Sequence, residues 1–386
     1  MSCTLTIDGS KLSESKQPEP IRVLITGGTG YLGSHLLYNL LTDTITQHTP
    51  LQLTYTYHQS QSLQIDTSLD PVAAVQLDIT SYDNVNALID FIKPHVVIHT
   101  AALSDTVDCE KNKSITNKIN VDGTKNIISS IINLSINTNQ QHECALVHIS
   151  SDWVYDGTES QYNEHMQANG FGVYGKSKLA AENIIVELCT KYNYTQYVIL
   201  RSALIYGCRS PLNHNKNGVL HSIIDAIQHK TEMKLYSNEY RSPIYIDDIV
   251  QIIRFFINDF TSSDTPLSPR SPPNHIVTHT SASNHIYNAG GNTSLSRYEM
   301  GKILAQYLLP PCETSQLRSI TLEQANQIKH RPKDLTMNSS KLRELTTYKT
   351  ISYSDGVIDM IKQMSNQFAI EAQRTPLPIT KRTPSV

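Results

Sequence analysis

The chain has 386 residues, with 32 lysines and arginines against 35 aspartates and glutamates, and a net charge of -3 at neutral pH. This length allows one large domain or two, each with a substantial core. The balanced charge, without a basic stripe or a polybasic run, excludes nucleic acid and an acidic membrane surface as expected partners. The longest apolar runs are far shorter than the roughly 20 residues of a membrane span. Residues 1–20 also lack the apolar run of a secretory signal, so we expect a cytoplasmic protein.

The first predicted strand leads directly into a glycine-rich turn. Residues 21–26, IRVLIT, form the short apolar run of a strand that is buried on both faces. Gly27, Gly30 and Gly33 follow, and the next residues, SHLLYNLL, have helical apolar spacing. A tight turn that opens a helix brings free N–H groups close to a pyrophosphate. The segment predicts a dinucleotide-binding turn, with an ordinary glycine-rich turn as the alternative.

The next strands bear on the choice of dinucleotide. Residues 51–57, LQLTYTY, end at His58, where NAD-binding proteins carry a carboxylate for the adenosine ribose. The missing acid removes a repulsion against a 2′-phosphate, although no arginine is present to bind one, and we expect NADPH in preference to NADH. Asp78 ends the third strand, beside the expected adenine position, and Ala101 and Ala102 leave room for the cofactor at the end of the fourth.

The histidines and cysteines are not expected to bind a metal. His95 and His99 lie at even spacing on the fourth predicted strand, which allows a ligand pair, but no third ligand is evident and a packed pair is favoured. The six cysteines contain no CxxC pair and no metal-ligand spacing with histidine. We therefore expect reduced thiols and no metal site.

Strands and helices alternate through the first half of the chain. After a helix that follows Asn120, residues 145–150 form a fifth strand, and a sixth begins at Tyr197. This alternation predicts an α/β fold, a doubly wound parallel sheet of the Rossmann type with a smaller C-terminal substrate-binding domain. Ligands bind such sheets at the carboxyl ends of the strands, which is where Ser151 and Asp152 lie.

The chemistry is expected at Tyr174 and Lys178. They are four residues apart at the start of a predicted helix, so both side chains lie on one face. An ammonium beside a phenol favours the charged phenolate, which lets a tyrosine take part in proton transfer near neutral pH. A nearby serine hydroxyl would hold a carbonyl or alcohol oxygen. This arrangement fits hydride transfer with a nicotinamide cofactor.

The second half is less regular. We expect a capping box at Ser296 and Glu299, and a helix capped by Asp247 or Asp248. The expected organisation is a flexible leader at 1–20, a dinucleotide-binding domain at 21–207 that 241–258 rejoins, a substrate-binding part at 208–240 and 285–365, a low-complexity insertion at 259–284, and a tail at 366–386.

Nine motifs in order give a resemblance to a known family. They are TGGTGYLG, HTAA, NVDGT, ISSDWVYDG, VYGKSK, LRSALIYG, YRSPIYIDDIV, YNAGG and HRPKDLTMNSSKL, spread over residues 21 to about 350. The chain resembles the extended short-chain dehydrogenase/reductase family. It is most similar to the branch that holds dTDP-4-dehydrorhamnose reductases and the regulatory beta subunits of methionine adenosyltransferase.

The resemblance implies roles for individual residues. Tyr174 would protonate the substrate carbonyl, Lys178 would bind the nicotinamide ribose and lower the pKa of the phenol, and Ser151 would bind the substrate oxygen. Asn120 matches an asparagine that organises a water relay. The resemblance places substrate contacts at Asp152, Trp153 and Arg241. Trp153 replaces the usual tyrosine and offers only an N–H donor. The alternative to a substrate role for Arg241 is a salt bridge to Asp247 or Asp248. The expected dinucleotide contacts are Gly27, Thr29, Gly30, Tyr31, Leu32, Gly33, His58, Asp78, Ile79, Ala101, Ala102, Tyr174 and Lys178.

Two functions follow from the resemblance. The first is an NAD(P)H-dependent oxidoreductase that reduces a nucleotide-linked 4-keto-6-deoxy sugar. The second is a non-catalytic dinucleotide-binding subunit that regulates methionine adenosyltransferase as its partner. Many relatives dimerise, so a homodimer is compatible with the resemblance. Fold and motifs do not separate the two functions.

Overall fold

A parallel sheet forms the centre of the structure, a computed structural model that describes residues 19–47, 51–63, 65, 72–262, 285–308, 315–327 and 329–374. Its seven strands in the described residues are β1 (Ile21–Thr26), β2 (Leu51–Tyr57), β3 (Val72–Gln76), β4 (Val96–His99), β5 (Ala145–Ser151), β6 (Tyr197–Ser202) and β11 (Ile286–Ala289). Their order is β11-β6-β5-β4-β1-β2-β3, and all neighbours are parallel. Each connection between parallel strands must cross one face of the sheet, usually as a helix, and the connections in this chain cover both faces.

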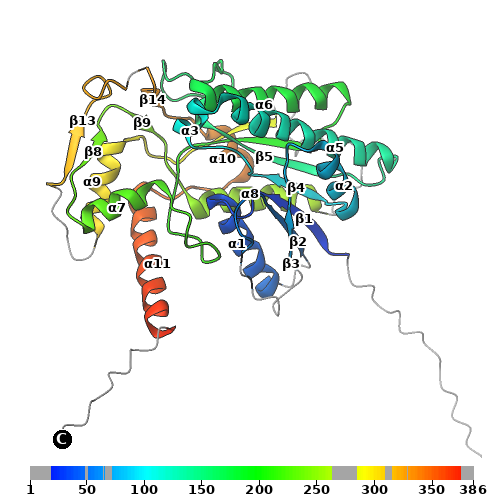
Figure 1. The fold of residues 1–386 in the computed structure, drawn as a ribbon, viewed down its shortest axis with the longest axis horizontal. Coiled ribbons are helices and arrows are strands. Elements are labelled where there is room, and N and C mark those ends of the chain that lie inside the picture. Colours follow the sequence, from blue (N-terminus) through cyan, green and yellow to red (C-terminus); the bar gives the residue numbers. More distant parts are fainter. Residues whose placement is uncertain are drawn as a thin grey trace, which may run out of the picture.

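Helices lie on the two faces of this sheet (Figure 1). One face carries α2 (Tyr82–Ile92), α5 (Gly123–Asn137) and α6 (Gly172–Lys191), with α3 (Thr106–Lys111), α4 (Lys113–Asn117) and the π-helical turn η1 (Lys118–Asp122) beside them. The other face carries α1 (Tyr31–Gln47) and α8 (Ile246–Thr261). The expected doubly wound sheet is confirmed.

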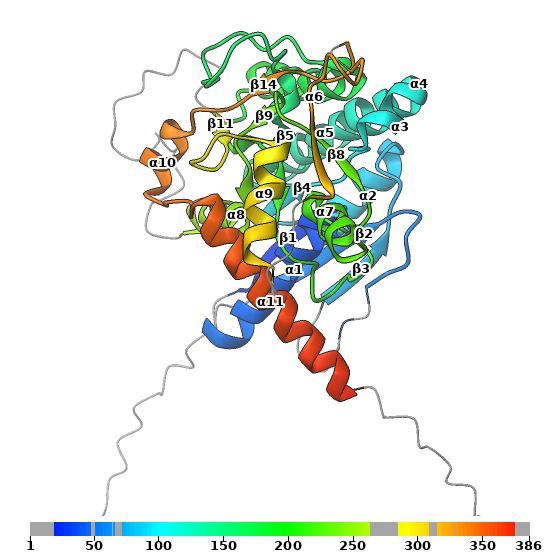
Figure 2. The same ribbon diagram turned by 90° about the vertical axis from the view of Figure 1, so that its left-hand side faces the viewer.

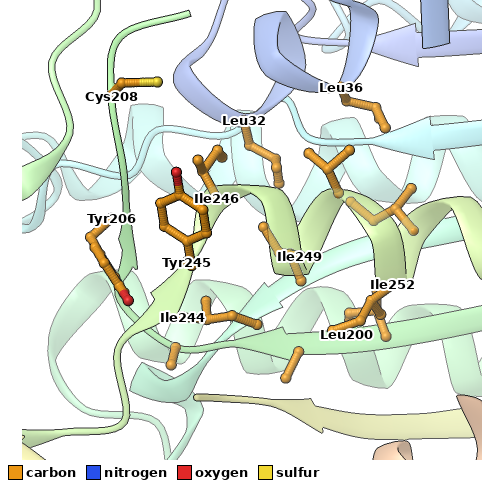
Figure 3. Packing of buried hydrophobic residues seen from close by; sticks show 14 of the residues in the cluster. Leu32, Leu36, Leu200, Tyr206, Cys208, Ile244, Tyr245, Ile246, Ile249 and Ile252 are labelled. Carbon is orange, nitrogen blue, oxygen red and sulfur yellow. The ribbon is translucent and has the colours of Figure 1, made fainter. Parts of the chain in front are cut away.

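The larger apolar core lies between the sheet, α1 and α8. Leu36 of α1, Leu200 of β6 and Ile249 of α8 are fully buried and converge there (Figure 3). The apolar spacing of α8 produces this packing, since Ile246, Ile249 and Ile253 recur every three or four residues on one face. This contact brings residues far along the chain back onto the first βα unit, next to the glycine turn.

A smaller part stands beside the sheet (Figures 1 and 2). Its elements are β7 (Ile205–Tyr206), α7 (Val219–Gln228), β8 (Met233–Tyr236), β9 (Tyr240–Arg241), β10 (Ile244–Tyr245), β12 (Leu295–Ser296), α9 (Arg297–Tyr307), β13 (Leu317–Ile320), β14 (Asp334–Leu335) and α10 (Ser340–Thr346). The last helix, α11 (Tyr353–Arg374), packs on α9 and extends away from the body (Figure 2). None of the described helices is long and apolar enough to cross a membrane.

Some expected boundaries were wrong. We assigned residues 285–365 to the substrate-binding part, whereas β11 pairs with β6 as the edge strand of the main sheet, with Ile286, Asn288 and Ala289 buried. The expected tail from residue 366 begins as helix, since α11 continues to Arg374. Residues 1–18 and 263–284, most of the expected leader and insertion, lie outside the described residues, as do 375–386.

The helix ends give one confirmation and one correction. Ser296 accepts a hydrogen bond from the Glu299 N–H at 3.2 Å and Glu299 accepts one from the Ser296 N–H at 2.8 Å, which confirms the capping box of α9. The expected cap of α8 was wrong. Tyr245 is the N-cap residue, and Asp247 and Asp248 lie inside the first turn, where their charge still favours the helix N-terminus.

Gly33→Ala should destabilise the glycine turn. A Cβ at Gly33 would lie 2.4 Å from the Gly27 carbonyl oxygen, so backbone must move. We expect the free energy of unfolding to fall by about 1–3 kcal/mol, the usual cost of overpacking, as measured by urea denaturation. Gly30→Ala is the matched control, since its Cβ would approach that oxygen only to 3.1 Å. Equal losses for both variants would contradict this explanation.

Candidate functional site

A cavity of about 370 Å³ opens at the carboxyl ends of the strands, between the glycine turn and the smaller part. Gly30 and Tyr31 line one wall, Ser151 and Tyr174 another, and Arg241 the side of the smaller part. The sheet places these residues together because β1 and β5 lie on either side of β4 and all three point the same way. This is where parallel α/β sheets bind ligands.

The end of β5 supplies an ordered pair of polar residues. Ser151 accepts a hydrogen bond from the Trp153 N–H at 3.3 Å and donates one to Asp152 Oδ1 at 3.0 Å. Both side chains are buried. Burial raises the pKa of Asp152, against the opposing effect of Arg241. Ser150, one residue earlier, also borders the cavity but donates its hydroxyl proton to Glu182 Oε1 at 2.5 Å, whereas the Ser151 hydroxyl is hydrogen-bonded with Tyr174.

Tyr174 and Lys178 lie on the cavity side of α6, as expected. A hydrogen bond with Ser151 favours the ionised phenol, but burial outweighs it and raises the pKa of Tyr174. The expected lowering of that pKa by Lys178 is therefore not seen. The physical reason is that burial dominates the pKa of Tyr174 and that Lys178 is not among the groups that act on it. The Lys178 Nζ instead donates to the Ile149 carbonyl at 2.7 Å, and burial lowers the pKa of Lys178 to about 8.

Asn120 is buried in the π-helical turn η1 and does not line the cavity. Its Oδ1 accepts from the Leu103 N–H at 2.8 Å, and its Nδ2 donates to the Leu103 carbonyl at 3.0 Å and to Ser177 Oγ at 2.9 Å. The side chain thereby fixes the loop after β4 to the start of α6. A π turn within an α-helical segment often marks a functional site, and here it turns the Asn120 amide toward Leu103.

The wall of the smaller part holds a buried group of charges that the sequence did not indicate. Arg241 is fully buried and donates to Glu239 Oε1 at 2.8 Å, while its Nε lies 3.8 Å from Asp152 Oδ2. Arg331 also pairs with Glu239, at 2.9 Å, and Arg297 Nε lies 3.7 Å from it. Burial works to raise the pKa of Glu239, but the three arginines lower it.

These contacts revise the roles expected for Arg241. Its ion-pair partners are Glu239 and Asp152, so the alternative of a salt bridge to Asp247 or Asp248 was wrong. Arg297 also lines the cavity and was missed, since only the tertiary structure brings the first turn of α9 beside Asp152. Trp153, the one tryptophan of the chain, lies edge-on to Tyr174 with ring centroids 6.2 Å apart and has Arg241 5.9 Å from its ring.

The expected dinucleotide residues fall into two groups. Gly30, Tyr31, Leu32, Gly33 and Ala102 line the cavity together with Tyr174 and Lys178. The other six expected residues lie outside it, and they include His58 and Asp78, which were expected at the adenosine ribose and the adenine: Gly27, Thr29, His58, Asp78, Ile79 and Ala101.

Two details describe that second group. Gly27 has a φ of 72°, which a side chain rarely adopts. Thr29 Oγ1 lies 2.8 Å from Ser60 Oγ, in the bend that follows β2.

The two histidines considered as metal ligands have other partners. His95 Nδ1 accepts from the Arg22 N–H at 2.9 Å, and the His99 ring nitrogens meet Thr26 and Thr124 at 2.7 and 3.1 Å. Among the described residues, no group of three His, Cys, Asp or Glu could hold a metal ion.

Comparisons with known proteins agree with this arrangement. The family model described as RmlD substrate binding domain matches residues 21–366. A dTDP-4-dehydrorhamnose reductase of Aggregatibacter actinomycetemcomitans is 28% identical over 60% of this chain and 66% of its own length. Methionine adenosyltransferase 2 subunit beta of Xenopus tropicalis is 26% identical over 68% of each chain.

Among solved structures, a dTDP-4-dehydrorhamnose reductase from Bacillus anthracis in complex with NADP superposes with a TM-score of 0.66 at 21% identity. The match covers 89% of this chain and 100% of that one. At this identity the likeness establishes the fold, an extended short-chain dehydrogenase/reductase fold.

Proposed function

Because the chain belongs to the RmlD substrate binding domain family, we propose that it is an NADPH-dependent reductase of a nucleotide-linked 4-keto-6-deoxy sugar. The observation that supports this most is the convergence of Ser151, Tyr174 and Lys178 on one cavity beside the glycine turn. Serine and tyrosine hydroxyls at the mouth of a dinucleotide site provide the donors that a carbonyl oxygen requires as hydride reaches its carbon.

Several residues at the cavity have a role in the proposed reaction. The glycine turn and Lys178 bind the dinucleotide, which supplies the hydride when bound. Ser151 holds the substrate oxygen, and Tyr174 donates the phenolic proton to that oxygen as negative charge develops on it. The raised pKa of Tyr174 keeps the phenol protonated at neutral pH, which suits the donor role in the direction of reduction. Trp153 and Arg241 border the space left for the sugar.

The proposal is tested by the oxidation of NADPH on addition of dTDP-4-dehydrorhamnose to the purified full chain. We expect turnover with NADPH and weaker binding of NADH, because His58 stands where a carboxylate would repel a 2′-phosphate. NADH binding about tenfold tighter than NADPH binding would contradict the cofactor preference, and dinucleotide binding without turnover would contradict the reductase.

The second candidate is a dinucleotide-binding regulatory subunit of methionine adenosyltransferase. The similarity to the Xenopus tropicalis beta subunit supports it as directly as the bacterial relative supports the reductase. Its test is co-purification from cell extract. A stoichiometric methionine adenosyltransferase partner, together with no turnover of the keto sugar, is the outcome that favours regulation.

A further inference from the structure

Behind Lys178, on the side away from the cavity, two imidazoles lie buried in the sheet. His148 of β5 and His99 of β4 are paired in the strand register, are at most 1% exposed, and have ring centroids 5.2 Å apart. His148 Nε2 is 3.4 Å from Lys178 Nζ. The His148 Nδ1 has no hydrogen-bond partner among the described residues, so an unusual buried polar group stands directly behind the expected catalytic lysine.

The hydrogen bonds define which nitrogen of each ring carries the proton. Thr124 Oγ1 donates to the Asn120 carbonyl at 2.7 Å, so it accepts from His99 Nε2–H, and His99 Nδ1 accepts from the Thr26 hydroxyl. An ammonium can only donate, so His148 Nε2 is the acceptor and its proton is on Nδ1. Burial and then Lys178 lower the pKa of both rings, so both are neutral at physiological pH.

Within the part of the chain that the structure describes, the hydrogen bonds of the Lys178 ammonium all go to β5. Its two hydrogen-bond acceptors, the Ile149 carbonyl and the His148 ring, are adjacent residues of the strand that also ends in Ser151. Glu182 acts to keep the lysine charged but is hydrogen-bonded to Arg201 and Ser150. The titratable groups that act directly on Lys178 are Glu182 of α6 and the two imidazoles, His148 of β5 and His99 of β4. The further charged or titratable neighbours are Arg201 of β6, which pairs with Glu182, and Asp152 and Cys109, which act on Tyr174.

We propose that His148 is a positioning residue for Lys178, whose neutral imidazole accepts a hydrogen bond from the ammonium and keeps it charged and fixed against β5. The proposal deepens the proposed function, since it concerns the lysine that would bind the nicotinamide ribose. An uncharged acceptor suits this place because it adds no negative charge beside Tyr174, which would oppose transfer of the phenolic proton to a developing oxyanion. It acts through Lys178 and does not touch the cavity.

The test measures the ionisation of Lys178 directly, by NMR of the full chain labelled with carbon-13 lysine, and the signal is assigned by its loss in Lys178→Arg. Wild-type Lys178 should titrate near pH 8. In His148→Leu the ammonium loses an acceptor, so the midpoint should fall by about one pH unit, a tenfold change in the protonation equilibrium. His148→Gln places an amide oxygen near the former Nε2 and should restore most of the midpoint.

Two controls separate positioning from damage. His142→Leu makes the same change in the imidazole that pairs with His95 and meets the Pro94 carbonyl before the start of β5, whereas Lys178 bonds near the end of that strand; it should leave the titration unchanged. Removing the unpartnered Nδ1 offsets part of the cost of losing the Nε2 acceptor, so the thermal midpoint of His148→Leu should stay within about 4 °C of that of wild type. A wild-type titration in His148→Leu, or equal shifts in the Leu and Gln variants, would overturn the proposal.

Dinucleotide binding gives an independent readout. Trp153 is the one tryptophan of the chain and lines the cavity, so energy transfer from it to bound NADPH reports affinity without turnover. NADPH affinity should fall above the pH at which Lys178 loses its proton. That pH should be lower in His148→Leu than in wild type and close to the wild-type value in His148→Gln. The proposed reductase can fail its turnover test while the lysine titration still shifts, so the two proposals are separately refutable.

Discussion

Tyr174→Phe should reduce turnover of the keto sugar by roughly two to four orders of magnitude, the range of general acid catalysis. The substitution removes only the phenolic hydroxyl, which is hydrogen-bonded with Ser151. Without it, negative charge develops on the substrate oxygen with no proton to neutralise it. The ring and its edge-on contact with Trp153 remain, so NADPH affinity measured by fluorescence should change by less than about threefold.

The control for this prediction is Tyr38→Phe, which makes the same change on the exposed side of α1, where 39% of the residue surface is accessible. It should retain wild-type turnover. Turnover of Tyr174→Phe within a few fold of wild type would remove the tyrosine from the mechanism. A chain that binds NADPH but turns over neither as wild type nor as variant would move the proposal to the regulatory subunit.

Glu182→Gln should lower the free energy of unfolding by about 3 kcal/mol or more, the lower end of the cost of breaking a buried ion pair. Arg201 is 4% exposed and donates to both Glu182 oxygens, at 2.7 to 3.1 Å. A neutral amide would leave that guanidinium charged in the interior without a counter-charge. The Arg201 guanidinium also donates to the Tyr155 hydroxyl, which in turn donates to Asn288 of β11. The loss of stability should therefore extend to the edge strand of the sheet.

The matched control is Glu232→Gln. Its ion pair with Arg318 is at the surface, with side chains 57% and 64% exposed, and such pairs contribute roughly 0–1 kcal/mol. Chemical denaturation of both variants measures the difference. A loss below about 1 kcal/mol for Glu182→Gln would mean that the pair is replaceable, as some buried ion pairs are.

The fold could be predicted because its signals are local. Buried parallel strands read as short apolar runs, the amphipathic helices repeat every three to four residues, and the glycine turn has a fixed spacing. The edge strand β11 was misassigned because it follows a long interruption and pairs with β6, almost 90 residues earlier. Nothing near Ile286 specifies which strand it joins.

The sequence by itself determined the family, the parallel sheet and the residues that meet at its carboxyl edge, because order along the chain fixes where parallel strands end. Ser151, Tyr174 and Lys178 follow from that order and from spacing on one helix. The tertiary structure alone decided their electrostatics. Burial sets the pKa values of Tyr174 and Lys178, and burial depends on which distant segments cover a side chain. The same holds for the partners of Arg241 and for His148 behind Lys178, which packing brings together without any shared sequence pattern.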